Sequence, residues 1–129
     1  MTSSPPPKIL IADDEAFIRL LLEQTLEELE DEGVELLRAE NGAEALQIIL
    51  TESPRLVFLD VMMPLMNGFE VCRQVKQHTD MHQVAIVLLT AKGQEYDRQV
   101  GAEVGADLYL TKPFDPDELL ALARRFLGQ

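Results

Sequence analysis

Short apolar runs alternate along the chain with longer segments in which apolar residues recur every three to four positions. The apolar runs predict five strands, at residues 9–12, 35–39, 56–59, 85–89 and 108–110. The runs at 9–11, 56–59 and 84–89 are continuously apolar, which is typical of strands covered on both faces. These three strands therefore belong in the middle of a parallel sheet.

The periodic segments between the strands predict helices. The first helix is indicated by Phe17, Ile18, Leu21, Leu22, Thr25, Leu26 and Leu29 and should be closed by Gly33. Asn41-Gly42 and Asn67-Gly68 should begin the second and third helices, residues 93–104 should form the fourth, and Asp115-Pro116 should begin the fifth with a capping box to Glu118. This alternation predicts an α/β fold, a doubly wound five-stranded parallel sheet with five helices and the flavodoxin-like strand order 2-1-3-4-5.

Length and charge narrow the class of protein. The 129 residues favour one domain at residues 8–129, preceded by a flexible, proline-rich lead-in at residues 1–7. The formal net charge of −12 repels phosphate backbones and anionic lipid, so neither nucleic acid nor a membrane is expected as a direct partner. The N-terminus lacks the apolar core of a signal peptide, and we expect a cytoplasmic protein.

The cysteine and histidine residues do not indicate a metal or redox site. Cys72 is the single cysteine and has no CxxC spacing around it, so we expect a small buried side chain. His78 and His82 have a helical ligand spacing, but they lie in a polar stretch and are expected to be exposed.

Polar residues follow the apolar runs at one edge of the predicted sheet. Asp13, Asp14 and Glu15 follow the first run, and Asp60, Thr90 and Lys112 come at or after the third, fourth and fifth. Because ligands bind beyond the carboxyl ends of parallel strands, these side chains should converge.

Each of these residues also has a structural explanation. Asp13 and Asp14 could cap the first helix, Thr90 could simply end its strand, and Lys112 could be a structural partner of Asp60. The excess of carboxylates over one lysine nevertheless favours a bound cation, and oxygen donors without a His/Cys set favour Mg²⁺ over zinc. An aspartate beside Mg²⁺ and a lysine can attack a phosphoryl group, which would produce an aspartyl phosphate.

The motifs around these residues resemble the receiver domain of two-component response regulators, the CheY-like superfamily. The resemblance covers residues 8–127 and is carried by Asp13-Asp14-Glu15, the loop from Asp60 to Gly68, Leu89-Thr90-Ala91 and Lys112-Pro113-Phe114. It implies that Asp60 is the phosphoacceptor and that Asp13 or Asp14, Asp60 and the Met62 carbonyl hold Mg²⁺. It also implies a catalytic role for Lys112 and Thr90 and a cis Lys112-Pro113 bond.

The resemblance further implies a switch that is phosphorylated by the phosphohistidine of a histidine kinase or histidine phosphotransfer protein. Phosphorylation should draw Thr90 inward and let Tyr109 follow, which would change the face formed by the fourth helix, fifth strand and fifth helix. That face should then bind a downstream protein or effector domain, or a second copy through charged residues, here Arg98, Asp107, Glu118 and Arg124 beside apolar Leu108 and Leu122. The domain either acts alone or belongs to a longer regulator.

The resemblance also bears on how long a phosphoryl group lasts. The positions two residues after Asp60 and Thr90 are Met62 and Lys92, and neither side chain is a carboxylate or amide that could orient an attacking water. We therefore predict a phosphoryl group that outlasts those of the fastest-cycling relatives.

Two other functions would use a similar fold. A receiver-fold module that works without phosphorylation would be expected to have lost some of the five residues Asp13, Asp14, Asp60, Thr90 and Lys112. An aspartate-nucleophile phosphatase of the haloacid-dehalogenase type would carry an Asp-x-Asp motif, whereas Met62 stands two residues after Asp60. We therefore expect no enzyme activity beyond self-phosphorylation and autodephosphorylation.

Overall fold

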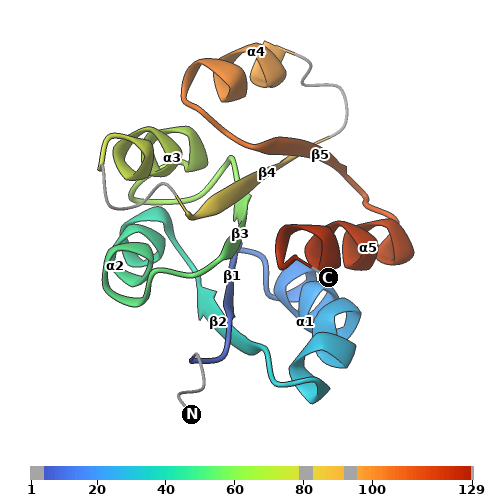
Figure 1. The fold of residues 1–129 in the computed structure, drawn as a ribbon. Helices are drawn as coiled ribbons and strands as arrows, with labels where there is room; N and C mark the ends of the chain where they lie inside the picture. Colours follow the sequence, from blue (N-terminus) through green and yellow to red (C-terminus); the bar gives the residue numbers. More distant parts are fainter. Residues whose placement is uncertain (1–4, 79–82, 92–95, 129) are drawn as a thin grey trace.

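Strands and helices alternate strictly along the chain (Figure 1). The computed structural model describes residues 5–78, 83–91 and 96–128. Within them the strands are β1 Lys8–Ala12, β2 Glu35–Ala39, β3 Leu56–Asp60, β4 Ala85–Ala91 and β5 Leu108–Lys112. The helices are α1 Ala16–Asp31, α2 Gly42–Glu52, α3 Gly68–Lys76, α4 Tyr96–Glu103 and α5 Pro116–Phe126.

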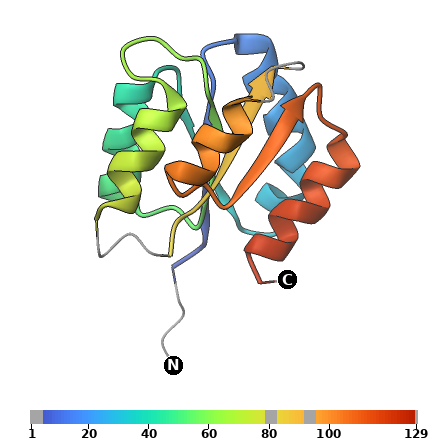
Figure 2. The same cartoon turned by 90° about the horizontal axis from the view of Figure 1, so that it is seen from above.

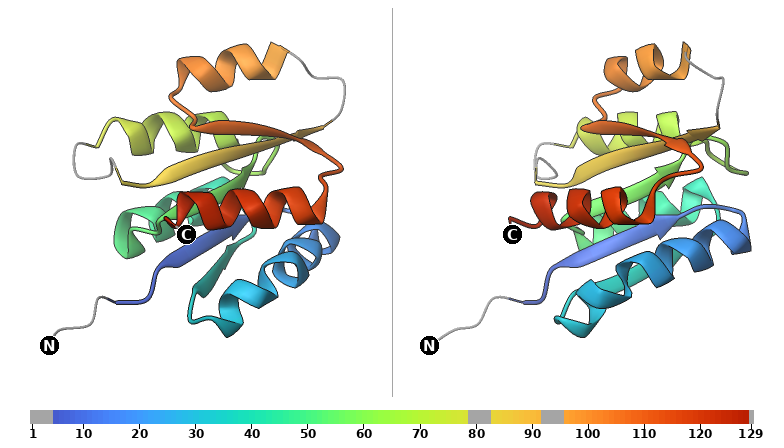
Figure 3. Two further views of the ribbon diagram at one scale, coloured as in Figure 1. Left: turned by 45° about the vertical axis from the view of Figure 1, so that its right-hand side comes forward. Right: turned by 90° about the vertical axis from the view of Figure 1, so that its right-hand side faces the viewer.

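The five strands form one parallel sheet in the order β2-β1-β3-β4-β5, which confirms the predicted fold class. Helices α1 and α5 cover one face of the sheet, and α2 and α3 cover the other (Figures 1 and 2). Helix α4 lies on the α3 side, beyond β4 and β5 (Figure 3).

The sheet separates two hydrophobic clusters, because successive side chains of a strand point to opposite faces. Leu10, Val57, Leu59, Ile86 and Leu88 belong to the cluster on the α2/α3 face. Ile9, Ile11, Phe58, Val87 and Leu89 belong to the cluster on the α1/α5 face. All ten side chains are fully buried, so β1, β3 and β4 are the covered central strands that their apolar runs predicted.

Side-chain caps begin three of the helices. Asn41 accepts a hydrogen bond from the Glu44 N–H at 2.8 Å, and Asn67 accepts one from the Glu70 N–H at 2.9 Å. Asp115 accepts from the Asp117 N–H at 3.0 Å, with Pro116 at the first helical position. The Asn-Gly and Asp-Pro start signals are therefore confirmed.

Several smaller predictions can also be compared with the described residues. Cys72 is fully buried, burial raises the pKa of its thiol to about 11, and the Lys112-Pro113 bond is cis, as expected. His78 is exposed, whereas His82, Lys92 and Gly93 lie outside the described residues.

In the described part of the chain, no helix combines the length and apolar character needed to span a membrane.

Candidate functional site at the carboxyl edge of the sheet

Strand register places Asp13 beside Asp60. Ala12 of β1 pairs with Leu59 of β3, so the next residue of each strand, Asp13 and Asp60, lies at the same level on the carboxyl edge. Both follow fully buried strand residues and are themselves buried, with 0% and 4% of their surface exposed. The continuity of the two apolar strands therefore brings two carboxylates together away from solvent.

Lys112 joins these two carboxylates from the end of β5. Its Nζ lies 2.9 Å from Asp13 Oδ2, 3.2 Å from Asp60 Oδ1 and 3.9 Å from Glu15 Oε1. Leu108 and Leu110 of β5 pack on the α1/α5 face, and by strand alternation Lys112 points to the same face. Asp60 points to this face as well, because it alternates with Leu56 and Phe58 of β3. The lysine is the cation that makes the buried pair of acids tolerable, because an unpaired buried charge is costly.

The pKa values reflect this shared pairing. The pKa of Asp60 is raised to about 7, mainly by burial and also by the negative charge of Asp13, although Lys112 and a hydrogen bond from the Met62 backbone oppose the shift. Burial by itself would lower the pKa of Lys112, but its hydrogen bond to Asp13 and the charges of Asp60 and Asp13 raise it overall. Lys112 therefore stays protonated at neutral pH, but its charge does not fully offset the burial and the charge of Asp13 that raise the pKa of Asp60.

Two glycines fix the loop that follows Asp60. The Gly68 N–H donates to the Val61 carbonyl at 2.8 Å, and a Cβ on Gly68 would come within 2.4 Å of the Asp60 carbonyl oxygen. A Cβ on Gly42, at the start of α2, would come within 1.7 Å of the Met66 carbonyl oxygen. The loop can fold back against β3 and α2 only because these positions lack side chains.

Thr90 and Tyr109 lie at the β4 and β5 side of the site. Thr90 is 3% exposed and follows Leu89, the residue of β4 that pairs with Asp60. Its hydroxyl donates to the Ala91 carbonyl at 3.5 Å. Half-buried Tyr109 packs against the same cluster as Leu88, so by strand alternation Thr90 and Tyr109 share the α2/α3 face of the sheet.

The acidic residues after β1 have the chemistry of a cation site. Asp13, Asp14 and Glu15 each offer a carboxylate oxygen within 4.8 Å of the others, and Asp14 and Glu15 are exposed. Oxygen donors of this kind fit Mg²⁺, which keeps part of its water shell. Asp60 is not one of these three carboxylates, but it lies beside Asp13 at the same edge of the sheet. The residues present therefore fit the metal.

Neither Asp13 nor Asp14 is the N-cap of α1, which was the structural alternative for both residues. The N-cap residue is Glu15, which makes no side-chain cap, while Asp13 Oδ1 accepts from the Glu15 N–H at 2.9 Å. Asp13 is thus held in a local turn that leaves its Oδ2 for Lys112.

Sequence reasoning missed three contacts around the site. Arg19 donates to the Asp13 carbonyl, Gly42 contacts the loop after Asp60, and Gly68 contacts the Asp60 backbone. The Asn-Gly pairs predict helix starts, and Gly68 also ends the loop that carries the resemblance, but neither pattern shows that a glycine directly after a cap permits close approach of another segment. Arg19 offered one signal, a charged residue between the apolar residues Ile18 and Leu22.

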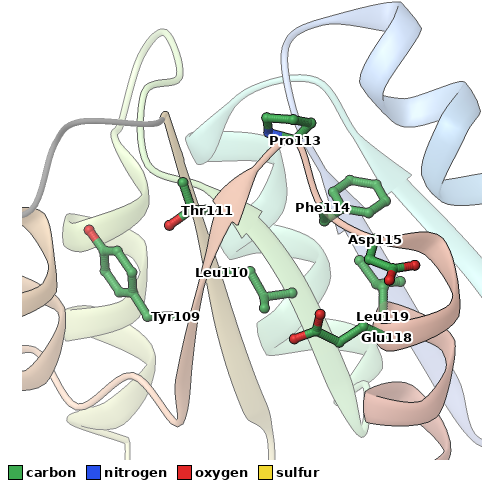
Figure 4. A pocket seen from close by; sticks show the side chains of 8 residues that line it. All are labelled: Tyr109, Leu110, Thr111, Pro113, Phe114, Asp115, Glu118 and Leu119. Atoms are coloured by element: carbon green, nitrogen blue, oxygen red, sulfur yellow. The ribbon is translucent and has the colours of Figure 1, made fainter.

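The face of β5 and α5 is less available for charged contacts than the sequence suggested. Arg124 pairs with Glu28 and Glu32 of α1, and Asp107 pairs with Lys76 at 2.8 Å. Leu122 is 7% exposed, and the side chain of Arg98 lies outside the described residues. Exposed Glu118 borders a pocket between β5 and α5 (Figure 4). Two of the four charged residues therefore already have partners within the chain.

Comparison with known proteins identifies the same family throughout. A family model described as "Response regulator receiver domain" matches residues 9–124. The "Probable transcriptional regulator ycf27" of Porphyra purpurea is 48% identical over 120 residues, which cover 93% of this chain and 47% of that protein. The "Alkaline phosphatase synthesis transcriptional regulatory protein PhoP" of Bacillus subtilis is 45% identical over 120 residues, covering 93% and 48%.

Solved structures agree with the sequence relatives. The BeF3-activated receiver domain of DrrB, from a Thermotoga maritima OmpR/PhoB homologue, superposes with a TM-score of 0.83 at 33% identity, covering 96% of this chain and 99% of that one. The chain spans about half the length of the transcriptional regulators that it matches.

Proposed function

The chain belongs to the response regulator receiver domain family of two-component systems, and from this premise we propose that it is a signalling switch phosphorylated on Asp60. The single observation that supports this role best is the position of Lys112, which lies 3.2 Å from Asp60 and 2.9 Å from Asp13. It places a buried carboxylate next to a fixed ammonium group at the edge of the sheet.

In the proposed reaction a carboxylate oxygen of Asp60 attacks the phosphorus of a phosphohistidine. The new P–O bond forms as the P–N bond breaks, and the imidazole leaves with the electron pair and is protonated. Lys112 would bind an oxygen of the transferred group, because an ammonium offsets charge on the phosphoryl oxygens. The donor is a histidine kinase or histidine phosphotransfer protein.

Asp13, Asp14, Asp60 and the Met62 carbonyl are the residues we propose to hold Mg²⁺. When bound, the ion supplies positive charge that offsets the phosphoryl oxygens and the ionised Asp60. Glu15 is a neighbouring carboxylate, with its Oε1 3.9 Å from Lys112, and would add negative charge near the ion.

The proposed switch follows from the charge that phosphorylation adds. A phosphoryl group brings about −1.5 to −2 charge and three acceptor oxygens, which would attract the Thr90 hydroxyl. Tyr109 shares the sheet face of Thr90 and would move with it, changing the surface around α4, β5 and α5. We propose that this surface then binds a downstream protein, an effector domain or a second copy of the chain.

The intact mass of the protein tests this proposal. The parent is incubated with acetyl phosphate and Mg²⁺, beside Asp60→Asn and an EDTA-treated sample. We expect one phosphoryl group on the parent and none in either control. An unmodified parent, in a buffer in which another receiver domain is labelled and after trials with candidate kinases, would instead favour a module that works without phosphorylation.

A further inference from the structure

Arg19 lies near the start of α1, with its guanidinium placed behind the acidic site. Nη1 donates to the main-chain carbonyl of Asp13 at 2.7 Å, and Nη2 lies 3.2 Å from Glu40 Oε1. Only 17% of its side chain is exposed. A planar guanidinium binds two acceptors at a fixed angle, which a flexible ammonium does not. Arg19 therefore joins the connection after β1 to the connection after β2.

Glu40 is itself held at the start of α2. Its N–H donates to Glu44 Oε1 at 2.9 Å, and the Glu44 N–H donates to Asn41 at 2.8 Å. Together these two bonds cap the first turn of the helix. The backbone of Glu40 is thereby tied to α2, and its carboxylate, on a side chain that is 70% exposed, connects Arg19 to this turn.

The same turn of α2 contacts the loop after Asp60. The Gly42 N–H lies 3.3 Å from the Pro64 carbonyl, and the backbone of Met66 packs directly over Gly42. A continuous set of contacts therefore runs from the Asp13 carbonyl through Arg19 and Glu40 to the loop that contains Met62.

We propose that Arg19 is a positioning residue, which holds Asp13 and the loop after Asp60 at a fixed separation. Its effect on metal binding and phosphorylation rests on the proposed function, because Asp13, Asp60 and the Met62 carbonyl would have to surround one ion. A shift of about 1 Å in such a group can cost roughly 100-fold in rate. Arg19 touches neither the ion nor the phosphoryl group and acts through the Asp13 backbone.

The test compares Arg19→Gln with Arg38→Gln and Arg19→Lys. Arg38 is a matched control, since its guanidinium pairs with Glu23 and the Leu36 carbonyl. Hydrogen–deuterium exchange is measured on the metal-free proteins, and Mg²⁺ affinity is measured by titration with the metal alone. The initial rate of labelling by acetyl phosphate is the third readout.

We expect Arg19→Gln to exchange faster than Arg38→Gln at both residues 13–15 and 61–67, and to bind Mg²⁺ about 10-fold more weakly, as is typical when support behind a ligand is lost. Arg19→Lys should have an exchange rate and a Mg²⁺ affinity between those of Arg19→Gln and the parent, because an ammonium restores the charge but not the fixed two-donor geometry of the guanidinium. Equal exchange and equal Mg²⁺ affinity in Arg19→Gln and Arg38→Gln would overturn the inference. A parent that neither binds Mg²⁺ nor is labelled would instead refute the proposed function, and the exchange data would still decide the role of Arg19.

Discussion

Lys112 and Asp13 form an ion pair of 2.9 Å although 99 positions separate them in the sequence. The same ammonium lies 3.2 Å from Asp60, so one lysine serves two buried acids. The end of β5 is therefore joined electrostatically to the ends of β1 and β3, and both acids depend on the lysine.

Replacing Lys112 by methionine should destabilise the metal-free protein at pH 8. The substitution leaves Asp13 and Asp60 buried without a cation, and breaking a buried pair in this way costs about 3–5 kcal/mol. Urea unfolding in EDTA measures the change. Lys8→Met, which removes the ion pair with Glu52 at the opposite edge of the sheet, should have a much smaller effect. Equal unfolding midpoints for the two variants would show that Lys112 is not needed to offset the acids.

The stability of metal-free protein should fall as pH rises from about 4 to about 7. The pKa of Asp60 is raised from 3.8 to about 7 by burial, so the folded state binds this proton more tightly than the unfolded chain does. Stability from this group is complete below pH 3.8 and is lost as pH passes the folded value. At roughly 1.4 kcal/mol per pKa unit, the loss is at most about 4 kcal/mol.

Asp60→Asn provides the control for this pH dependence. Urea unfolding across pH 4–8 should show a shallower decline for the variant, and Asp60→Asn should be the more stable protein at pH 8 in EDTA. Adding Mg²⁺ at pH 8 should stabilise the parent more than the variant, because ligand binding to the folded state adds to its stability. Parallel pH curves for the two proteins would argue against a raised pKa at Asp60.

Gly42→Ala should weaken Mg²⁺ binding and slow phosphorylation. A Cβ at this position would lie 1.7 Å from the Met66 carbonyl oxygen, so the loop after Asp60 has to move. Gly33→Ala is the matched control: it strains a backbone with φ of +103° but meets nothing within 4 Å. Both variants should lose stability, whereas only Gly42→Ala should lose about 10-fold or more in Mg²⁺ affinity. A similar Mg²⁺ affinity in both variants would remove Gly42 from the support of the site.

Asp107→Ala should loosen the connection between α4 and β5. The Asp107 carboxylate accepts from the Ile86 N–H at 2.7 Å and from Lys76 at 2.8 Å, and Lys76 also donates to the Val84 carbonyl. Leaving the Ile86 N–H without this acceptor should cost about 1–3 kcal/mol. Hydrogen exchange at residues 104–110 should accelerate, while exposed Asp31→Ala should leave it unchanged. Unaltered exchange in Asp107→Ala would mean that other contacts hold this connection.

The phosphoryl group on Asp60 should be hydrolysed slowly, and Met62→Gln should shorten the lifetime of this group. Met62 is 66% exposed beside Asp60, and its thioether has no strong donor or acceptor with which to orient a water. An amide at this position could orient one. Loss of the phosphoryl mass is followed over time after removal of the donor. Loss from the parent within seconds, without a phosphatase, would contradict the prediction.

Much of the fold follows from apolar runs and start signals in the sequence. The strand order and the caps of α2, α3 and α5 were predicted, because buried strands and Asn-Gly or Asp-Pro starts are local features. Strand ends were placed too early: β3 includes Asp60 and β5 includes Lys112. The predicted strands end where the apolar run ends, whereas the backbone pairing of the parallel strands continues through these polar residues.

The approximate location of the candidate site was also predictable, since parallel strands bring their carboxyl ends to one edge. The contacts of Arg19 with Glu40 and of Gly42 with Met66 were not, because they depend on how separate loops fold across that edge. The ion pairs of Asp107 with Lys76 and of Arg124 with Glu32 were missed for the same reason: the identity of a charged residue does not reveal its partner.

The proposed switch would connect the two faces of the sheet at its carboxyl edge. Asp60 and Lys112 continue the side-chain alternation of the α1/α5 face, whereas Thr90 and Tyr109 share the opposite face with α2 and α3. Substitutions within one network of interacting residues do not combine additively. A substitution at Tyr109 should therefore have a different effect in a protein that carries Lys112 than in one that lacks it.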